Sequence, residues 1–138
     1  MKVAIIYAST TGNTEALANA AAEAAKNAGR EVTVKTADQA DIGETLSADL
    51  ILLGSPAMGD EVLEDSMEEF YAKLKASLSG KKVGLFGSYD WGDGQWMRDW
   101  EERVAQAGAQ LVTDSVMANN APDDAALEEC KALGAALA

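Results

Sequence analysis

Short apolar runs alternate with helix-type stretches along the chain, and this alternation is the feature that most limits its fold. Runs rich in β-branched and aliphatic residues predict five strands, at Lys2–Tyr7, Glu31–Thr36, Asp49–Gly54, Lys82–Ser88 and Gln110–Val116. Near-continuous apolar strands separated by helices are typical of a parallel sheet covered on both faces. We therefore expect a three-layer, doubly wound α/β fold with five strands in the order 2-1-3-4-5.

Apolar residues at helical spacing fill the gaps between these runs. Four stripes predict helices that begin and end near Leu17–Ala28, Leu63–Leu78, Met97–Ala107 and Leu127–Leu137. Glycines follow the first three stripes, as is common where helices end. The segment Asp38–Ser47 predicts at most one short helix. With 138 residues, the chain is long enough to bury its own core, so we expect a single domain over residues 1–138.

The charge balance excludes several classes of partner. The chain has 23 acidic and 11 basic residues and a formal net charge of −12. Binding to nucleic acid or to anionic membranes needs a basic surface, so we expect neither. An acidic surface either keeps the protein in solution or steers it toward basic surfaces of partner proteins. We expect a monomer.

Histidine is absent and Cys130 is the only cysteine. The commonest general base and metal ligand is therefore missing, which argues against triad hydrolysis and against a metal site. Cys130 lies on an apolar helical stripe, which indicates core packing. The first seven residues lack the apolar region of a signal peptide and no run reaches membrane-spanning length, so we expect a cytoplasmic protein.

A loop rich in hydroxyl groups follows the first predicted strand and precedes the first predicted helix. It reads Ser9-Thr10-Thr11-Gly12-Asn13-Thr14-Glu15. Hydroxyls and the free N–H groups of a helix start can hold a phosphate. No Lys or Arg occurs between Val3 and Ala25, which favours a resident cofactor phosphate over a transferred one. Thr11 or Asn13 acting only as a helix cap is the alternative.

The loops after the other central strands are also unusual. Met58 lies in a polar loop after the third strand, and Tyr89 and Trp91 lie in a Gly- and Asp-rich loop after the fourth. Asn119 and Asn120 follow the fifth. A methionine and a tryptophan can enclose a flat ring, and the carboxyl ends of parallel strands share one edge. A phosphate loop and a ring-binding pair at that edge together describe an FMN site.

Four motifs resemble those of short-chain flavodoxins from anaerobic bacteria. They are the phosphate loop, Ala57-Met58-Gly59-Asp60-Glu61, Gly87-Ser88-Tyr89-Asp90-Trp91-Gly92-Asp93-Gly94 and Trp96-Met97-Arg98-Asp99-Trp100. The chain also lacks the fifth-strand insertion of long-chain flavodoxins. The resemblance implies a flavodoxin-like fold and one non-covalently bound FMN. The protein would then be a low-potential, one-electron carrier whose FMN alternates between semiquinone and hydroquinone. Its partners would be basic surfaces of redox partner proteins, in transient complexes.

The resemblance also implies roles for individual residues. Ser9, Thr11 and Thr14 would offer hydroxyls to the phosphate, and Thr10, Gly12 and Asn13 backbone N–H groups. Met58 and Trp91 would cover the two ring faces. The ribityl chain and the ring edge would be contacted by Pro56, Ala57, Gly59, Asp60, Glu61, Ser88, Tyr89, Asp90, Gly92 and Asn120. Asp90 stands where the family usually has glycine, and Ser55 stands where related chains often carry cysteine, which we expect to matter little.

Two other functions can be compared with these residues. A phospho-acceptor receiver domain needs an aspartate at the end of the third strand and a lysine after the fourth, where this chain has Ser55 and Ser88. An FMN-dependent reductase acting on nicotinamide or quinone is the remaining alternative. The loops are short and lack an arginine placed for a nicotinamide phosphate, so we favour an electron carrier that is not an enzyme.

Overall fold

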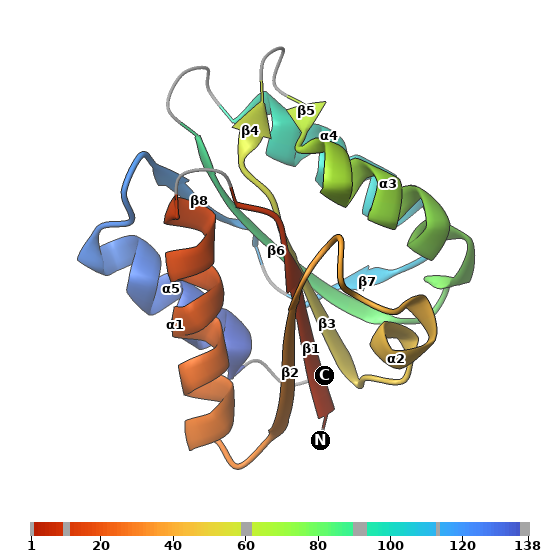
Figure 1. The fold of residues 1–138 in the computed structure, drawn as a ribbon, viewed down its shortest axis with the longest axis horizontal. Coiled ribbons are helices and arrows are strands. Elements are labelled where there is room, and N and C mark those ends of the chain that lie inside the picture. The colour runs from red at the N-terminus through yellow and green to blue at the C-terminus, as the bar shows by residue number, and fades with distance from the viewer. Residues whose placement is uncertain (1, 10–11, 59–61, 90–93, 113, 136–138) are drawn as a thin grey trace.

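The computed structural model describes residues 2–9, 12–58, 62–89, 94–112 and 114–135 (Figure 1). Strands and helices alternate over these ranges, as the sequence predicts. The strands are β1 Lys2–Tyr7, β2 Glu31–Thr36, β3 Leu50–Gly54, β4 Ala57–Met58, β5 Val62–Leu63, β6 Lys82–Tyr89, β7 Gln110–Leu111 and β8 Val116–Asn119. The helices are α1 Asn13–Asn27, α2 Ile42–Leu46, α3 Asp65–Leu74, a 3₁₀ turn at Lys75–Ser77, α4 Gln95–Gln106 and α5 Asp124–Gly134.

The main sheet is parallel, and its order is β2-β1-β3-β6, with β7 and β8 both paired to β6. The predicted doubly wound fold and strand order are therefore confirmed. The fifth strand differs from the prediction because it is made of two pieces. Polar residues interrupt the apolar run, and the Ser115 hydroxyl donates to Glu101 of α4 at 2.9 Å. The second piece continues to Asn119, which lies in the sheet rather than in a following loop.

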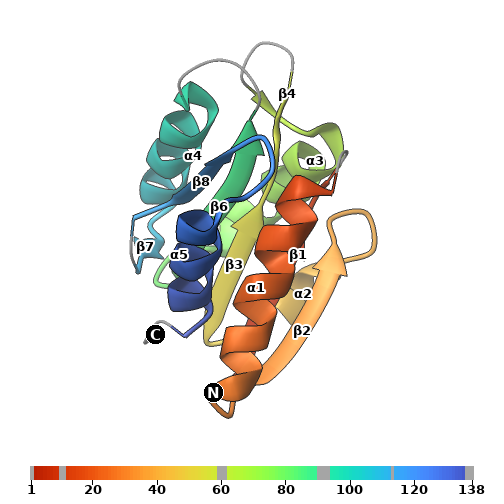
Figure 2. The ribbon, with the colours of Figure 1, turned by 90° about the vertical axis from the view of Figure 1, so that its left-hand side faces the viewer.

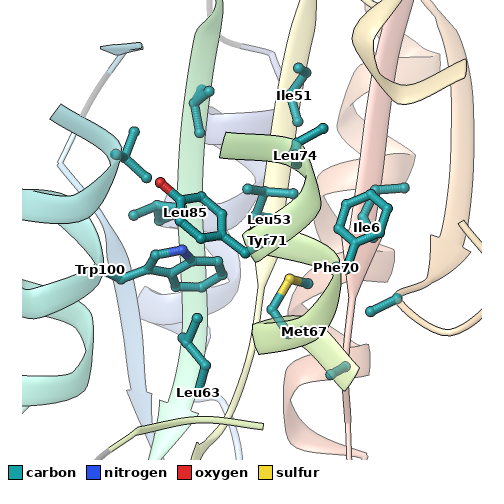
Figure 3. Close-up of a cluster of buried hydrophobic side chains, with 14 of the residues drawn as sticks. Ile6, Ile51, Leu53, Leu63, Met67, Phe70, Tyr71, Leu74, Leu85 and Trp100 are labelled. Atoms are coloured by element: carbon teal, nitrogen blue, oxygen red, sulfur yellow. The ribbon is translucent and has the colours of Figure 1, made fainter. Parts of the chain in front are cut away.

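Helices cover both faces of the sheet (Figure 2). Helices α1 and α5 lie on one face, over a core that includes Ile5, Leu52 and Phe86. Helices α3 and α4 lie on the other face together with the short α2, over a core that includes Leu53, Leu85 and the aromatic residues of α3 and α4 (Figure 3). The two faces use alternate residues of the same strands, as the pleat of a strand requires.

The helices begin in two different ways. Carboxylates of Asp41, Glu64 and Asp123 accept N–H groups in the first turns of α2, α3 and α5. By contrast, α1 and α4 begin at Gly12 and Gly94, which provide no side-chain acceptor. The helices that follow β1 and β6 therefore start differently from the other three.

Candidate functional site

The central strands end side by side, so the loops that follow them meet at one edge (Figure 1). Tyr7 of β1 lies beside Gly54 of β3. Gly54 in turn lies beside Phe86 of β6, and Tyr89 at the end of β6 lies beside Asn119 of β8. Four segments that are far apart in sequence are thereby brought together, as the fold prediction requires.

The loop after β1 directs backbone N–H groups at one oxygen atom. The Ser9 hydroxyl oxygen accepts the N–H of Gly12 at 3.1 Å and that of Glu15 at 3.4 Å. Gly12 adopts a left-handed φ of +90°, which a residue with a Cβ rarely adopts. A Cβ built at Gly12 meets no atom within 4 Å, so this glycine is required by its backbone conformation rather than by crowding.

Thr14 and Ser88 are both buried and form a hydrogen bond with each other. Their hydroxyl oxygens are 2.8 Å apart, and the two residues come from α1 and β6. This bond ties the start of α1 to the strand that leads into the Tyr89 loop. A hydroxyl has one proton and two lone pairs, so after this bond each group keeps capacity for two more hydrogen bonds.

Tyr7 supplies a contact that the sequence patterns do not reveal. Its hydroxyl donates to the Glu15 carboxylate at 3.0 Å. Burial raises the pKa of Tyr7, and the bond and charge of Glu15 raise it further. The contact joins the end of β1 to the first turn of α1.

The loop after β3 folds into a small hairpin. Ala57 and Met58 form β4, which pairs antiparallel with Val62 and Leu63 of β5. Pro56 is buried, whereas Ala57 and Met58 are half-buried and Val62 is exposed. The half-buried Met58 agrees with a position at the margin of a binding site.

Ser55 precedes this hairpin and is fully buried. The close approach of β6 explains why a glycine follows Phe86, since a Cβ at Gly87 would lie 2.2 Å from the Ser55 carbonyl oxygen. Ser55 was expected to matter little. Its hydrogen bonds link β3 to the hairpin, to α3 and to α4, and no sequence pattern marks a single serine for such a role.

Tyr89 and Asn120 meet at the ends of β6 and β8. The Asn120 N–H donates to the Tyr89 carbonyl at 2.6 Å, and Asn120 has a left-handed φ of +59°, which asparagine tolerates. Its side-chain amide donates to the side-chain oxygen of Asn119 at 2.8 Å. The Tyr89 ring packs against Trp96 of α4, with centroids 5.4 Å apart and an interplanar angle of 49°.

The described part of the site includes ten of the predicted residues, and it brings them to the one edge. The other predicted residues lie outside the described ranges; they are Thr10, Thr11, Gly59, Asp60, Glu61, Asp90, Trp91 and Gly92. Within the described ranges, no group of three or more His, Cys, Asp or Glu side chains is placed to hold a metal ion.

Comparison with known proteins identifies the family. The flavodoxin profile matches residues 5–134. The chain belongs to the flavodoxin family. The flavodoxin of Megasphaera elsdenii is 48% identical over 137 residues, which are 99% of this chain and 98% of that protein. The solution structure of its two-electron reduced form superposes with a TM-score of 0.87, covering 96% of this chain and 95% of the other.

Two further relatives differ in how much of their length the chain covers. The flavodoxin of Clostridium beijerinckii is 44% identical over 135 residues, which are 97% of each chain. A putative diflavin flavoprotein of Nostoc is 31% identical over 142 positions, covering 100% of this chain and 24% of that protein. The predicted resemblance to short-chain flavodoxins of anaerobic bacteria is therefore confirmed.

No helix among the described residues is long and apolar enough to cross a membrane.

Proposed function

We propose that this flavodoxin holds one FMN non-covalently at the carboxyl edge of its sheet and passes single electrons between partner proteins at low potential. Membership of the flavodoxin family makes the chain an FMN-based electron carrier. Nothing favours the alternative of a reductase acting on nicotinamide or quinone. The relatives of this chain that are named flavodoxin support an electron carrier rather than an enzyme.

One observation carries the placement of the phosphate. Two backbone N–H groups at the start of α1 converge on a single oxygen, that of Ser9. A convergent pair of N–H groups at a helix start suits an anion, because the helix end adds partial positive charge. The glycine at the start of α1 has no side chain to compete for them. We assign this end of the site to the FMN phosphate, with Ser9, Thr10, Thr11, Gly12, Asn13 and Thr14 as its partners.

The opposite part of the edge suits the flavin ring. The Pro56–Met58 segment and Ser88–Tyr89 flank it, and Asn120 lies beside Tyr89. We assign the ring faces to Met58 and Trp91, and the ribityl chain and ring edge to the other hairpin and loop residues named above. When bound, FMN supplies a ring that accepts and releases electrons one at a time, while the protein positions the ring and shields it from water.

Acidic residues around the ring explain a low potential. Glu64 and Asp65 follow the hairpin, and the sequence adds Asp60, Glu61 and Asp90 in the adjoining loops. At about 10 Å and an effective dielectric constant of 20–50, each carboxylate opposes an added negative charge by roughly 0.7–1.7 kcal/mol before salt screening. Negative charge on the ring is therefore destabilised, which lowers the potential at which the last electron enters.

The partners follow from the same charges. A negatively charged rim attracts basic surfaces, and transient pairing of this kind suits a protein that must release each partner after one electron. We assign the carboxyl edge as the docking face and a monomer as the working form. The cytoplasmic location stays a prediction.

The phosphate assignment is tested by titrating the apoprotein with FMN and with riboflavin, which lacks the phosphate. Two charge-assisted hydrogen bonds predict at least about 100-fold tighter binding of FMN. Ser9→Ala should reduce that ratio, because it removes one hydroxyl from the phosphate end and leaves the ring end unchanged. Equal dissociation constants for the two flavins in the wild-type protein would refute the assignment.

A further inference from the structure

Ser55 stands between β3 and the hairpin, and four hydrogen bonds fix it there. Its N–H donates to the Phe86 carbonyl at 3.2 Å, and its carbonyl accepts the indole N–H of Trp96 at 3.3 Å. Its hydroxyl donates to the Pro56 carbonyl at 3.0 Å and accepts the Glu64 N–H at 3.0 Å. The backbone bonds attach Ser55 to the sheet and to α4, and the hydroxyl reaches both ends of the loop 56–63.

We propose that Ser55 is a positioning residue, whose hydroxyl ties Pro56 to Glu64 at the neck of the β4–β5 hairpin and so holds the strands β4 and β5 in place for the flavin ring. The inference rests on the proposed function, which assigns Pro56–Glu61 to the ring. Ser55 itself is fully buried and acts through the loop. The two groups that its hydroxyl binds lie directly before β4 and directly after β5.

One hydroxyl serves both ends because it can donate one proton and accept another. The donated bond fixes the first peptide of the loop, and the accepted bond fixes the residue just after it. Glu64 then caps α3, since its carboxylate accepts the Ser66 N–H at 3.0 Å and also the Ser66 hydroxyl. The loop's end and the helix start are therefore set by consecutive hydrogen bonds that begin at Ser55.

The backbone of Ser55 has little room to compensate for a lost hydroxyl. Its carbonyl lies so close to β6 that a Cβ at Gly87 would stand 2.2 Å away. Trp96 is itself buried beside it. Alanine at position 55 would leave the Glu64 N–H without its acceptor. A half-buried N–H group without an acceptor destabilises the local structure. Cysteine would keep a weaker donor and acceptor of larger radius.

The neck is tested first without any cofactor, by amide hydrogen exchange of the apoprotein followed by NMR. In Ser55→Ala the Glu64 amide should exchange about tenfold faster, and Ser55→Cys should fall between alanine and the wild type. Amides inside β3, such as Leu52, should change much less. Thr45→Val is the matched control, because Thr45 is also buried and its hydroxyl donates to a backbone carbonyl, that of Asp41 at 2.7 Å. Thr45 lies on α2, so its replacement should leave Glu64 unchanged.

Flavin titration then separates the neck from the phosphate end. Hairpin strands that are held less firmly at Ser55 must be fixed when the ring binds, so both Ser55 variants should bind FMN and riboflavin more weakly by the same factor, about 3- to 10-fold in alanine. Their FMN-to-riboflavin ratio should equal that of the wild type, whereas Ser9→Ala should lower the ratio.

Two exchange results would overturn the inference. One is an unchanged Glu64 amide in Ser55→Ala, and the other is faster exchange at Leu52 and Glu64 by the same factor, which would mean general destabilisation. If the wild type binds neither flavin, the proposed function fails, while the exchange result still decides whether Ser55 closes the neck. If the wild type binds FMN and both Ser55 variants bind it equally well, the positioning role is wrong and the proposed function stands.

Discussion

At the scale of single residues, two buried polar atoms in the α3–α4 core have no hydrogen-bond partner among the described residues. They are the Tyr71 hydroxyl and the Trp100 indole nitrogen, and their rings meet edge to face with centroids 6.1 Å apart (Figure 3). The Arg103 guanidinium lies 4.8 Å from the Tyr71 ring centroid. Burial raises the pKa of Tyr71, an effect that the charge of Arg103 opposes. A buried donor without an acceptor lowers stability, and this pair does so inside an otherwise apolar core.

Replacing Tyr71 with phenylalanine should therefore stabilise the protein. The change keeps the ring and its edge-to-face contact and removes only the unpartnered hydroxyl. We expect the free energy of unfolding in urea to rise by about 1 kcal/mol. Tyr7→Phe is the control, because the Tyr7 hydroxyl has a partner in Glu15, and that change should lower stability. A loss of stability in Tyr71→Phe would mean that its hydroxyl has a partner.

Cys130 gives a prediction with a defined pH range. Its side chain is fully buried, and burial raises the pKa of the thiol to about 12. Above about pH 9 the unfolded chain releases this proton while the folded protein keeps it, so stability falls as pH rises by at most about 1.4 kcal/mol per pH unit. Urea unfolding between pH 7 and 10 should show this decrease in the free energy of unfolding in the wild type. In Cys130→Ala the contribution of the thiol to that decrease should be absent. Equal slopes in the two proteins would contradict a buried neutral thiol.

At the scale of elements, α3 and α4 are joined by one well-formed ion pair. The two nitrogens of Arg103 lie 2.8 and 2.7 Å from the two oxygens of Glu68. The hydrogen bond with Arg103 is the main cause of the lowered pKa of Glu68. The side chains are 33% and 46% exposed, so solvent weakens the pair. We expect a modest contribution to stability, of about 0.5–1 kcal/mol.

Glu68→Gln should lower the free energy of unfolding by that amount at pH 7. The folded-state pKa lies below the unfolded one, so the contribution is present above about pH 4.5 and is lost as the pH falls through the folded pKa. The stability difference between wild type and variant should therefore disappear in acid. Glu69→Gln removes a neighbouring exposed carboxylate and should have little effect. A difference that persists in acid would show that the ion pair is not its source.

The elements were predictable where one physical pattern decides them. Buried parallel strands are mostly apolar, so β1, β3 and β6 could be located closely. β2 has no fully buried residue, and its β-branched residues located it instead. The division of the fifth strand could not, because it is accompanied by a hydrogen bond from Ser115 to Glu101 of α4, and no sequence pattern indicates that contact. The hairpin strands have two residues each and are too short to show alternation. The predicted stripe at Leu63 begins before α3, because Glu64 caps the helix.

The site was predictable to a different degree. The hydroxyl-rich loop and Met58 stand out by composition and lie at the expected edge. Ser55 could not be recognised, since its role depends on Pro56, Glu64 and Trp96 meeting around one hydroxyl. Likewise, the sequence suggests that Thr14 faces the phosphate, and only the packing reveals its bond to Ser88. Patterns locate loops, whereas hydrogen bonds between distant segments follow from the completed fold.

At the scale of the whole molecule, the two edges of the sheet differ in charge. Helices start at the carboxyl edge, where Glu15, Asp65 and Asp124 lie in first turns. They end at the amino edge, where Lys26, Arg103 and Lys131 lie in last turns. Each placement favours its own helix. Because all the helices run the same way, these local preferences add up to one charge separation across the protein, with the negative end at the carboxyl edge.

This charge separation should orient collisions with a basic partner. With a basic cytochrome as the probe, we expect electron-transfer rates to fall at least about tenfold between 10 and 150 mM salt. Asp65→Asn at the carboxyl edge should slow the reaction more than Glu31→Gln at the amino edge, although both remove one negative charge. Equal effects would mean that net charge acts without orientation.

The ends of the described chain both lie at the amino edge. Lys2 pairs with Glu31 in the sheet, and the Arg30 guanidinium donates to the carbonyls of Gly134 and Ala135 at 3.1 and 2.9 Å. A linker joined at either end would therefore leave the opposite edge uncovered. Fused in this way to another redox unit, the domain would become a tethered shuttle, and its transfer rate would depend on linker length rather than on the concentration of free carrier.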